Sequence, residues 1–384
     1  MDGVGSPTDS SKRRPSDAET QCMRPAPGLQ PLESAQTGNQ AITFDPVTDA
    51  AWKQLVSRKP TDLFHSPRWM KVVAASFDLK FGGHVIERDG RPVAGVAWSD
   101  LDDMFGRRRV TLPFSDYSDL IAESMEDRDA LLEAGTAGNI PWLVRSHDAG
   151  LGSSEACSGQ REFVHHVIDI RPDVDELSAG LSSMARRNTR KADNSGVEIF
   201  EGTSKDHLRA WVNLHRNLRR EKYHLLAQPF GFFESIWDEF IAPGDGFLLL
   251  ASHNGEIIAG TVYVNSGNTC YYKFNASSPD SLRLRPNNAL MWQGMLRAKE
   301  RGFENVDLGR TSVSQPGLAE FKSSYGGVAS SMIEYRFVPQ GYEQSASEVQ
   351  ARKVISQLTT LLTGPQVPDS VTEQASELLY RFFA

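Results

Sequence analysis

The residue types best suited to chemistry gather in the stretch from Leu284 to Gly327. Asp307 ends a short run that alternates apolar and polar residues, and a carboxylate there can accept a proton or orient an amine. Lys322 can stabilise a developing oxyanion or bind a phosphate or carboxylate group. The plainer interpretation pairs Asp307 with Arg310 and leaves Lys322 as an ordinary surface lysine.

A second group carries concentrated positive charge. Four basic residues share one face of a helix predicted over Val174–Ala192, in two i,i+4 pairs: Arg186, Arg187, Arg190 and Lys191. Like charges at this spacing repel one another unless an anion lies nearby. Together with Asn188 they are therefore candidates to bind a diphosphate, a nucleotide or a tRNA acceptor stem. The alternative is a solvated helix face without a ligand.

Two pairs of polar residues are weaker candidates. Asn287 and Asn288 follow Pro286 at a predicted helix start, where side chains and main-chain N–H groups can hold a phosphate. Helix capping alone would explain one of them. Asp116 and Tyr117 lie in an irregular polar and aromatic segment and can line a substrate cleft. A satisfied turn aspartate and a packed tyrosine are the alternative.

Other residues narrow the chemistry. Tyr271, Tyr272 and Lys273 follow one another on a predicted strand, so alternate side chains must face the core and a ligand; we place Tyr272 with the substrate. The three cysteines are widely separated, and no histidine cluster has ligand spacing, so we expect no metal. No Ser-His-Asp order is visible, which disfavours a covalent enzyme intermediate.

The elements that position these residues form a strand–helix–strand unit. A helix is predicted from Pro286, which suits the first turn, to Gly302, which suits a left-handed stop. A strand over Phe303–Leu308 then delivers Asp307 and Arg310 to its carboxyl end. Units of this kind place their ligand at the carboxyl ends of the strands, near a helix N-terminus.

Two predicted hairpins resemble each other. Asp89-Gly90 and Asn254-Gly255 are strong hairpin turns between β-rich runs, and their offset is 255 − 90 = 165 residues. Ala94-Gly95 and Ala259-Gly260 follow the two turns at equal distances. Helices precede each hairpin and a further strand follows it, so we predict a duplicated α/β unit.

The 384-residue chain is long enough for two domains. Residues 1–42 lack aromatic residues and are rich in polar types, which predicts a disordered tail. We expect one domain over 43–170, a second over 171–340, and two amphipathic helices within 341–384. The two domains are expected to be small mixed sheets that meet along a groove, with Asp307 and Lys322 facing it.

Composition restricts the setting of the protein. The net charge of −8 gives no general attraction to nucleic acid, although a local basic patch can provide one. No apolar run approaches the roughly 18 residues of a transmembrane helix, and no secretory leader pattern opens the chain. We therefore expect a cytoplasmic protein, or one peripheral at the inner face of the membrane. The oligomeric state is left open.

The order of these segments resembles the FemAB-like acyltransferases, which carry two GNAT domains in tandem. The resemblance rests on five segments: Pro113–Tyr117, Met184–Ala192, Leu284–Asn288, Asp307–Arg310 and Phe321–Gly326. It implies an α/β fold of mixed sheets with two GNAT-like domains. This sequence differs from the usual CoA-binding pattern of the family, because no Gln/Arg-x-x-Gly-x-Gly/Ala loop precedes Pro286. The long charged helical arm of some Fem transferases is also missing.

The resemblance implies acyl transfer to an amine by direct attack. We expect an acyl-CoA donor, used as a co-substrate and not held permanently, and an amino sugar or a lipid-linked cell-envelope or polysaccharide precursor as acceptor. A Fem-type aminoacyltransferase that uses aminoacyl-tRNA, and a non-catalytic binding protein, are the alternatives. The catalytic candidates are Lys322 and Asp307, and Asn287 and Asn288 are the candidates for holding the donor. The remaining candidates are assigned to substrate: Asp116, Tyr117, Arg187, Asn188, Arg190, Lys191, Tyr272 and Arg310.

Overall fold

The computed structural model describes residues 44–58 and 62–384, and these belong to one compact unit. The predicted disordered tail over 1–42 lies outside the described residues. The first half of the chain contains three helices and five strands, with short 3₁₀ turns between them: α1 (Ala50–Arg58), α2 (Pro67–Phe77), β1 (Gly82–Arg88), β2 (Arg91–Asp103), β3 (Gly106–Thr111), α3 (Met125–Thr136), β4 (Trp142–Ser146) and β5 (Cys157–Asp169).

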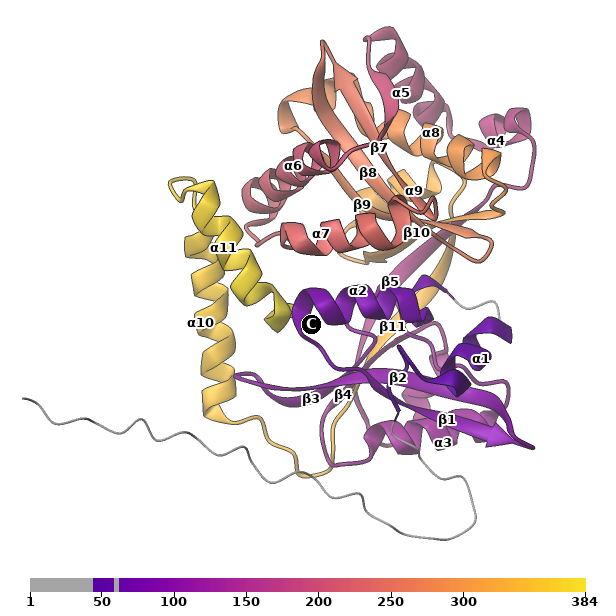
Figure 1. Ribbon diagram of the computed structural model, residues 1–384, viewed down its shortest axis with the longest axis vertical. Helices are drawn as coiled ribbons and strands as arrows, with labels where there is room; N and C mark the ends of the chain where they lie inside the picture. The colour runs from indigo at the N-terminus through magenta and orange to yellow at the C-terminus, as the bar shows by residue number, and fades with distance from the viewer. Residues whose placement is uncertain (1–43, 59–61) are drawn as a thin grey trace, which may run out of the picture. The chain divides into compact units, whose positions relative to one another are not determined.

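The second half repeats this order with additions at its start and end and with a helix, α9 (Pro316–Ser323), inserted before its last strand (Figure 1). Its elements are α4 (Val174–Gly180), α5 (Ser183–Asn194), β6 (Glu198–Gly202), α6 (Lys205–Tyr223), α7 (Phe230–Ile236), β7 (Gly246–His253), β8 (Glu256–Ser266), β9 (Thr269–Ser277), α8 (Pro286–Glu300), β10 (Asn305–Ser312), α9 (Pro316–Ser323), β11 (Val328–Phe337), α10 (Ala346–Leu362) and α11 (Asp369–Leu379).

All eleven described strands form one sheet, in the order β1-β2-β3-β4-β11-β5-β10-β9-β8-β7-β6. The last strand of each half lies beside the other half: β5 pairs with β10, and β11 pairs with β4. The two exchanged strands also pair with each other along most of their length. The expectation of two sheets that meet along a groove is therefore wrong in this respect, because the strand exchange joins both halves into a continuous sheet.

The duplicated hairpins are confirmed, and their details match. Both central residues of each turn have positive φ, 52° and 70° at Asp89-Gly90 and 53° and 81° at Asn254-Gly255, as tight primed turns require. Each hairpin also has a bulge, after Ile86 in one and after Ala251 in the other, at the same offset of 251 − 86 = 165 residues. The turn residues and the bulge are thus both repeated in the second hairpin.

The glycines that follow the turns have a common packing role. A Cβ atom at Gly95 would lie 3.1 Å from the ring of Trp52 on α1. A Cβ atom at Gly260 would lie 2.6 Å from the ring of Trp211 on α6. Each glycine therefore lets a buried tryptophan of a preceding helix lie directly on its hairpin.

Two local predictions need correction. The helix expected over Val174–Ala192 is interrupted, because Ser182 accepts a hydrogen bond from the Ala185 N–H and begins a separate helix, α5. The second prediction is a loop over Leu151–Gln160, a segment of small residues; the loop ends early, since β5 already begins at Cys157 and pairs with β11. Residues with weak strand preference are held there by a neighbouring strand that is distant in sequence.

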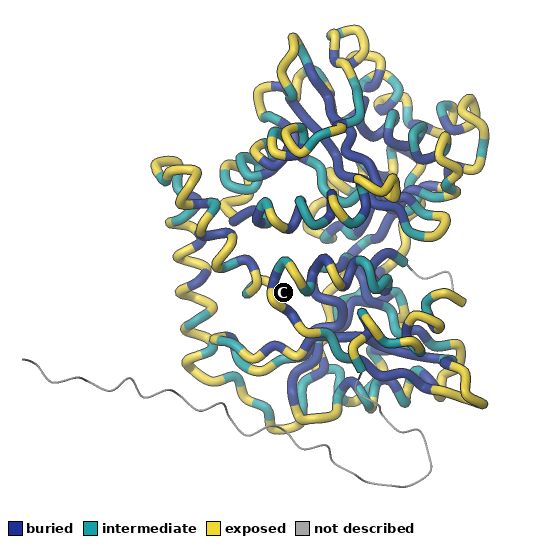
Figure 2. The backbone as a smooth tube through the Cα atoms, in the orientation of Figure 1, coloured by how far each residue is buried: buried dark blue, intermediate teal, exposed yellow. Residues whose placement is uncertain are grey.

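The largest hydrophobic core spans both halves. It joins α1, α2, β2 and β3 to α6, α7, β8 and β9, and its members include Phe64, Trp69, Trp211 and Phe232. Two further cores lie over the separate halves, one beneath α8 and one beneath α3. Figure 2 shows the buried backbone continuing through the sheet from one half into the other. Packing therefore reinforces the strand exchange.

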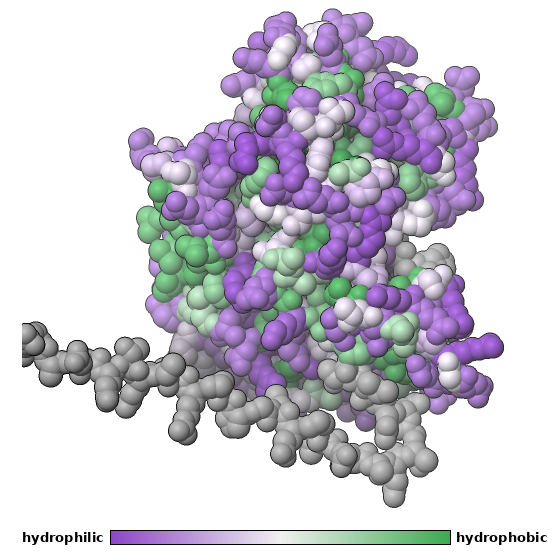
Figure 3. Space-filling model, in the orientation of Figure 1, coloured by the Kyte–Doolittle hydropathy of each residue, from purple (hydrophilic) through white to green (hydrophobic). Residues whose placement is uncertain are grey.

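The C-terminal helices bridge the two halves. On α10, Arg352 donates a hydrogen bond to the Phe105 carbonyl, and Asp369 at the start of α11 accepts from Arg216 and Arg220 on α6. Their outer side is apolar, with exposed Leu361 and Leu378, and appears green in Figure 3. No helix within 44–58 and 62–384 is long and apolar enough to cross a membrane.

Candidate active site

A cavity of about 650 Å³ opens where two parallel strands diverge. β9 and β10 pair only from Thr269–Asn305 to Tyr271–Asp307, and the cavity lies beyond this point. Its walls come from the diverging strands, the start of α8, α9 and the end of α6. Six of the lining residues bear on the chemistry: Asp116, Tyr272, Lys273, Asn287, Arg310 and Lys322.

Lys322 is buried at the base of this cavity, with 4% of its surface exposed. Its Nζ atom donates hydrogen bonds to the main-chain carbonyls of Gly309 at 2.8 Å and Arg310 at 3.2 Å. Burial lowers the pKa of the Lys322 ammonium to about 8, although the carboxylates of Asp116 and Asp307 oppose this shift. The group is therefore largely charged at neutral pH, close to its titration point, and has a third N–H to offer a ligand.

Asp116 reaches the same cavity from the segment that follows β3. Its Oδ2 atom accepts a hydrogen bond of 2.7 Å from Nζ of Lys273. Burial alone would raise the pKa of Asp116, but Lys273, with Arg310 and Lys322, lowers it to about 2. The carboxylate also lies against Gly309, where a Cβ atom would be 3.0 Å from Oδ2. The cavity thus holds a permanent anion among three cations.

A smaller cavity of about 240 Å³ adjoins this ion pair from the other side. It shares Asp116, Lys273 and Arg310 with the larger cavity. Tyr380 and Phe383, at the C-terminal end, form part of its wall. The residues that follow α11 therefore contribute to the surroundings of the site.

Asp307 lies outside the lining of both cavities. It is buried, and its Oδ1 atom accepts hydrogen bonds from the Gly309 N–H at 2.6 Å and from His165, whose Nε2 lies 2.9 Å away. Its Oδ2 atom accepts from the hydroxyl of Tyr117 at 2.9 Å. Burial, followed by the charge of Asp307, raises the pKa of the Tyr117 phenol. The predicted partner of Asp307, Arg310, instead lies 3.5 Å from Glu334.

The hydrogen bonds at Asp307 continue through a row of histidines. Nδ1 of His165 lies 2.9 Å from Nε2 of His147, and Nδ1 of His147 lies 2.7 Å from Oδ2 of Asp119. His65 joins from the side, with Nε2 2.8 Å from the Asp119 carbonyl. Sequence reasoning missed this network because its members come from distant segments. Only their residue types hinted at it.

Three of the five segments that carry the family resemblance meet at one hydroxyl group. Tyr325 Oη accepts a hydrogen bond of 2.9 Å from the Asn288 side chain and donates one of 3.1 Å to the Asn288 carbonyl. Thr189 of α5 lies 3.4 Å from the same oxygen. The Asn288 side chain is thus used in a buried structural hydrogen bond. Asn287 instead lines the cavity, and its side chain donates a hydrogen bond to Ser277 at 3.1 Å.

The basic residues of α5 are located elsewhere. Arg187, Arg190 and Lys191 are exposed and Asn188 is half-buried, and none of them lines a cavity described above. Arg186 instead donates to the carbonyls of Ser178 and Ala179. Of the predicted substrate residues, the structure brings together Asp116, Tyr272 and Arg310 with Lys322, and leaves Tyr117 in the buried network.

Lys273 is the main site residue that the sequence-based assignment omitted. It sits between Tyr272 and Phe274 on β9, and its ammonium lies over the Phe64 ring at 4.4 Å as well as against Asp116. The strand alternation already predicted that one member of Tyr271–Lys273 faces a ligand. Within the described residues, no group of three His, Cys, Asp or Glu side chains is placed to hold a metal ion.

Comparison with known proteins agrees with this geometry. Residues 181–323 match the family described as an acetyltransferase (GNAT) domain. FemX is a similar solved structure, with a TM-score of 0.54 at 16% identity over 74% of this chain and 94% of FemX. The chain has a FemAB-like tandem GNAT fold. Residues 181–323 provide the acyltransferase domain, and the predictions of the fold and of an acyltransferase are confirmed.

Two further solved structures are similar to this chain. One is a tandem GNAT protein from the clavulanic acid biosynthesis pathway, with a TM-score of 0.52 and 12% identity over 80% of this chain and 100% of that protein. The other is the C-terminal domain of a putative lysylphosphatidylglycerol synthetase from Agrobacterium fabrum, with a TM-score of 0.50 and 14% identity over 83% and 96%. No curated protein sequence matches the chain significantly.

Proposed function

We propose that the protein is an N-acyltransferase in which an acceptor amine attacks an activated acyl group inside the 650 Å³ cavity. The observation that supports this most strongly is the position of Lys322. Its buried ammonium has two N–H bonds fixed on the carbonyls of Gly309 and Arg310, so the remaining one is held in a defined direction. A donor that is already oriented stabilises a developing oxyanion without reorganisation.

The proposed step needs no covalent enzyme intermediate. The amine nitrogen attacks the carbonyl carbon, the C–N bond forms, and the oxygen takes up negative charge against Nζ of Lys322. Collapse then breaks the bond to the leaving group, which departs as a thiolate when the donor is a thioester. The proton lost by the attacking nitrogen ends on that thiolate, through solvent. Asp116, an anion at any physiological pH, is suited to hold the acceptor as an ammonium before attack. The ammonium first releases one proton to solvent, and the neutral amine that results then attacks.

An acyl-CoA is the donor that we propose. The N–H of Asn288 is bonded to the Arg285 carbonyl at 3.0 Å, so the start of α8 offers fewer free amides to a pyrophosphate than a glycine-rich loop would. The exposed side chains of Arg283 and Arg285 can supply positive charge there instead. For the acceptor, we propose an amino sugar or a cell-envelope or polysaccharide precursor that carries one.

The decisive experiment measures thiol release from a panel of acyl-CoAs in the presence of amino sugars and other amines. We expect acceptor-dependent release that is lost in Lys322→Met. Lys299→Met is the matched control, because Lys299 also donates to two main-chain carbonyls, at 3.0 Å each, but lies outside the cavity lining. Failure of every acyl-CoA both to react and to raise the thermal midpoint would refute the proposed donor.

A second candidate function uses aminoacyl-tRNA as the donor. The supporting observation is the exposed basic face of α5, where Arg187, Arg190 and Lys191 have no carboxylate partner among the described residues. Two results together would favour this function. The protein would bind aminoacyl-tRNA, and more weakly once these three residues are replaced by glutamine, and no acyl-CoA would react. Binding of an acceptor without any acylated product would instead indicate a non-catalytic protein.

A further inference from the structure

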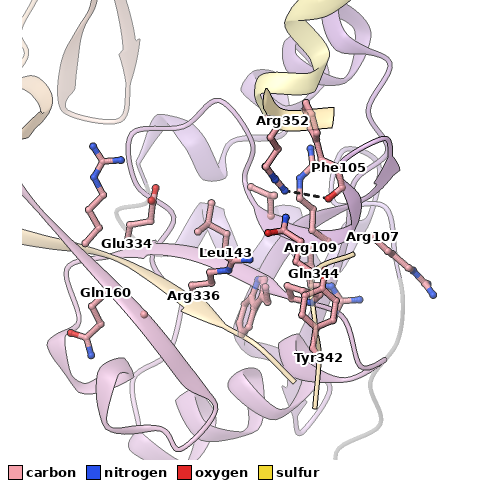
Figure 4. Close-up of a pocket in the computed structure, with 17 residues that line it drawn as sticks. Phe105, Arg107, Arg109, Leu143, Gln160, Glu334, Arg336, Tyr342, Gln344 and Arg352 are labelled. Atoms are coloured by element: carbon pink, nitrogen blue, oxygen red, sulfur yellow. Dashed lines mark hydrogen bonds between the residues drawn. The ribbon is translucent and has the colours of Figure 1, made fainter. Parts of the chain in front are cut away.

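A third cavity, of about 490 Å³, lies on a part of the sheet that the proposed reaction does not use (Figure 4). Its floor is formed by β3, β4, β11 and β5, which are neighbours in the sheet. Arg336 pairs across the strands with Leu143 and Gly159, and Leu143 pairs with Val110. Side chains paired in this way share one face of the sheet.

Several arginines project from that face or over it. Arg336 on β11 and Arg161 on β5 lie on the cavity face by strand register, and Arg108 lies there two residues before Val110. Arg352 approaches from α10 and lies 4.9 Å from the ring of Phe105, which also lines the cavity. Four guanidinium groups from four different elements therefore surround one space in a protein whose net charge is −8.

Little negative charge balances this group within the described residues. Arg108 has Asp103 as a partner at 2.7 Å, but Arg161 and Arg336 have no carboxylate partner, and Arg352 donates only to the Phe105 carbonyl. Glu334, the one acidic side chain among the cavity's described lining, is already held by Arg145 at 3.0 Å.

Two neighbouring arginines, Arg107 and Arg109, also line the cavity but do not belong to this set. Arg109 lies on the opposite face of β3, where Asp100 binds it at 2.6 Å and where it caps carbonyls at the end of α3. Arg107 points away from the group in Figure 4. The cluster is thus specific to one face and is not a general property of the run of three arginines.

The members of the cluster repel one another. Burial, and then the charges of Arg108 and Arg336, lower the pKa of the Arg352 guanidinium from its ordinary value, although the carboxylates of Asp103 and Glu348 oppose this shift. Arg352 nevertheless stays charged at neutral pH, because arginine is protonated far above this range. A ligand that brings negative charge would relieve this repulsion.

We propose that this cavity binds a small molecule with two or more adjacent phosphate groups, through Arg108, Arg161, Arg336 and Arg352. Guanidinium groups bind phosphate oxygens in pairs of parallel hydrogen bonds, and several around one cavity suit adjacent phosphates better than a single carboxylate. The volume lies within the range of small-molecule sites. The rings of Phe105 and Tyr342 provide an apolar wall for a base or another flat group.

The test measures binding without any acyl donor reaction, so it is independent of the proposed transferase activity. Thermal unfolding of the full chain is followed with inorganic pyrophosphate, ADP, UDP and CoA, and affinities are measured by calorimetry. We expect stabilisation by pyrophosphate or by a diphosphate nucleotide, and a loss of affinity of about tenfold or more in the double variant Arg336→Gln, Arg352→Gln. Arg91→Gln, an exposed arginine at the start of β2 and outside the cavity, is the matched control.

A second measurement avoids any question of folding in the variant. Arginines of the unaltered protein are modified with phenylglyoxal, and the sites are mapped by mass spectrometry with and without pyrophosphate. Protection of Arg336 and Arg352 but not of Arg91 supports the proposal, and a preference for one nucleotide shows that the base is also recognised. Absence of binding by every phosphate compound overturns it, as does equal binding by the double variant. Binding of oligonucleotides alone overturns it in favour of a nucleic-acid surface.

Discussion

The Nζ atom of Lys273 lies 2.7 Å from Oδ2 of Asp116, and this ion pair joins the two halves of the chain at the edge of the cavity proposed as the active site. The Lys273 side chain is only 5% exposed and that of Asp116 28%, so water screens the pair weakly. Removing one partner from such a pair leaves a costly unpaired charge. The pair therefore contributes to stability and to the electrostatics of the cavity together.

The first prediction concerns stability in acid. Because the folded protein lowers the pKa of Asp116 from 3.8 to about 2, this carboxylate stabilises the fold above pH 3.8, and its contribution disappears as the pH falls toward 2. We expect the free energy of unfolding of Asp116→Asn to be about 2 kcal/mol below that of the natural chain near pH 6. The difference should shrink below pH 4. Urea unfolding at several pH values measures this. Asp102→Asn, at an exposed position on β2, should show no such convergence; the same convergence in both variants would contradict the assignment.

The second prediction concerns the pH dependence of transfer. If the charged form of Lys322 stabilises the oxyanion, kcat/KM calculated on the concentration of the unprotonated acceptor amine should stay level below pH 8 and fall above it, since the pKa of Lys322 is about 8. Lys322→Arg should move this fall to higher pH. Lys322→Met should lower kcat by about 10²–10³-fold, as for the loss of one oxyanion donor. A rate that rises through pH 8 would show instead that the neutral amine acts as a base.

The third prediction separates backbone strain from a steric clash. Gly309 has φ of 66° and lies against Asp116, whereas Gly138 has φ of 88° with open space around its missing Cβ. Alanine at either position should lower the free energy of unfolding by about 1 kcal/mol, because its side chain disfavours the left-handed backbone conformation. Only Gly309→Ala should cost more than this and reduce transfer, because it displaces Asp116 and the carbonyl that Lys322 uses. Equal losses of stability with unchanged activity in both variants would argue against a role for this contact.

The fourth prediction concerns the histidine network. Although burial lowers the pKa of His147, the hydrogen bond and charge of Asp119 raise it overall from 6.5. A raised pKa means that this group stabilises the fold fully below pH 6.5, and that the contribution is lost as the pH rises through the folded value. The thermal midpoint should therefore decrease across this range, and His147→Gln should flatten part of the decrease. His65, whose pKa is also raised, accounts for a remaining part; an unchanged slope in the variant would remove His147 from the explanation.

Local features of the fold were readable in the sequence because their causes are local. Asp89-Gly90 and Asn254-Gly255 adopt positive φ for reasons contained in two residues, so the hairpins and the duplication could be predicted. The break before α5 was harder, because Ser182 begins a new helix inside a continuous apolar pattern. The exchange of β5 and β11 had no local signal, since their pairing depends on strands more than a hundred residues away.

The candidate site shows the same division. Lys322, Asp116, Tyr272 and Arg310 could be assigned from residue type and order, and the structure places them around one cavity. Whether a side chain lies on a cavity or behind it depends on three-dimensional packing, so Asp307 could not be distinguished from them. Lys273 could have been chosen from the strand alternation, but only contact with Asp116 identifies its role.

The exchanged strands also restrict how substrates enter. Proteins with two separate lobes admit ligands by a hinge that opens the gap between them. Here such a hinge would have to break the hydrogen bonds that bind β5 to β10 and β11 to β4. Substrates must therefore reach Lys322 while the shared sheet stays intact, and any movement that admits them is confined to peripheral parts such as α9, which lines the cavity. The intact sheet would keep the proposed catalytic groups aligned throughout a turnover.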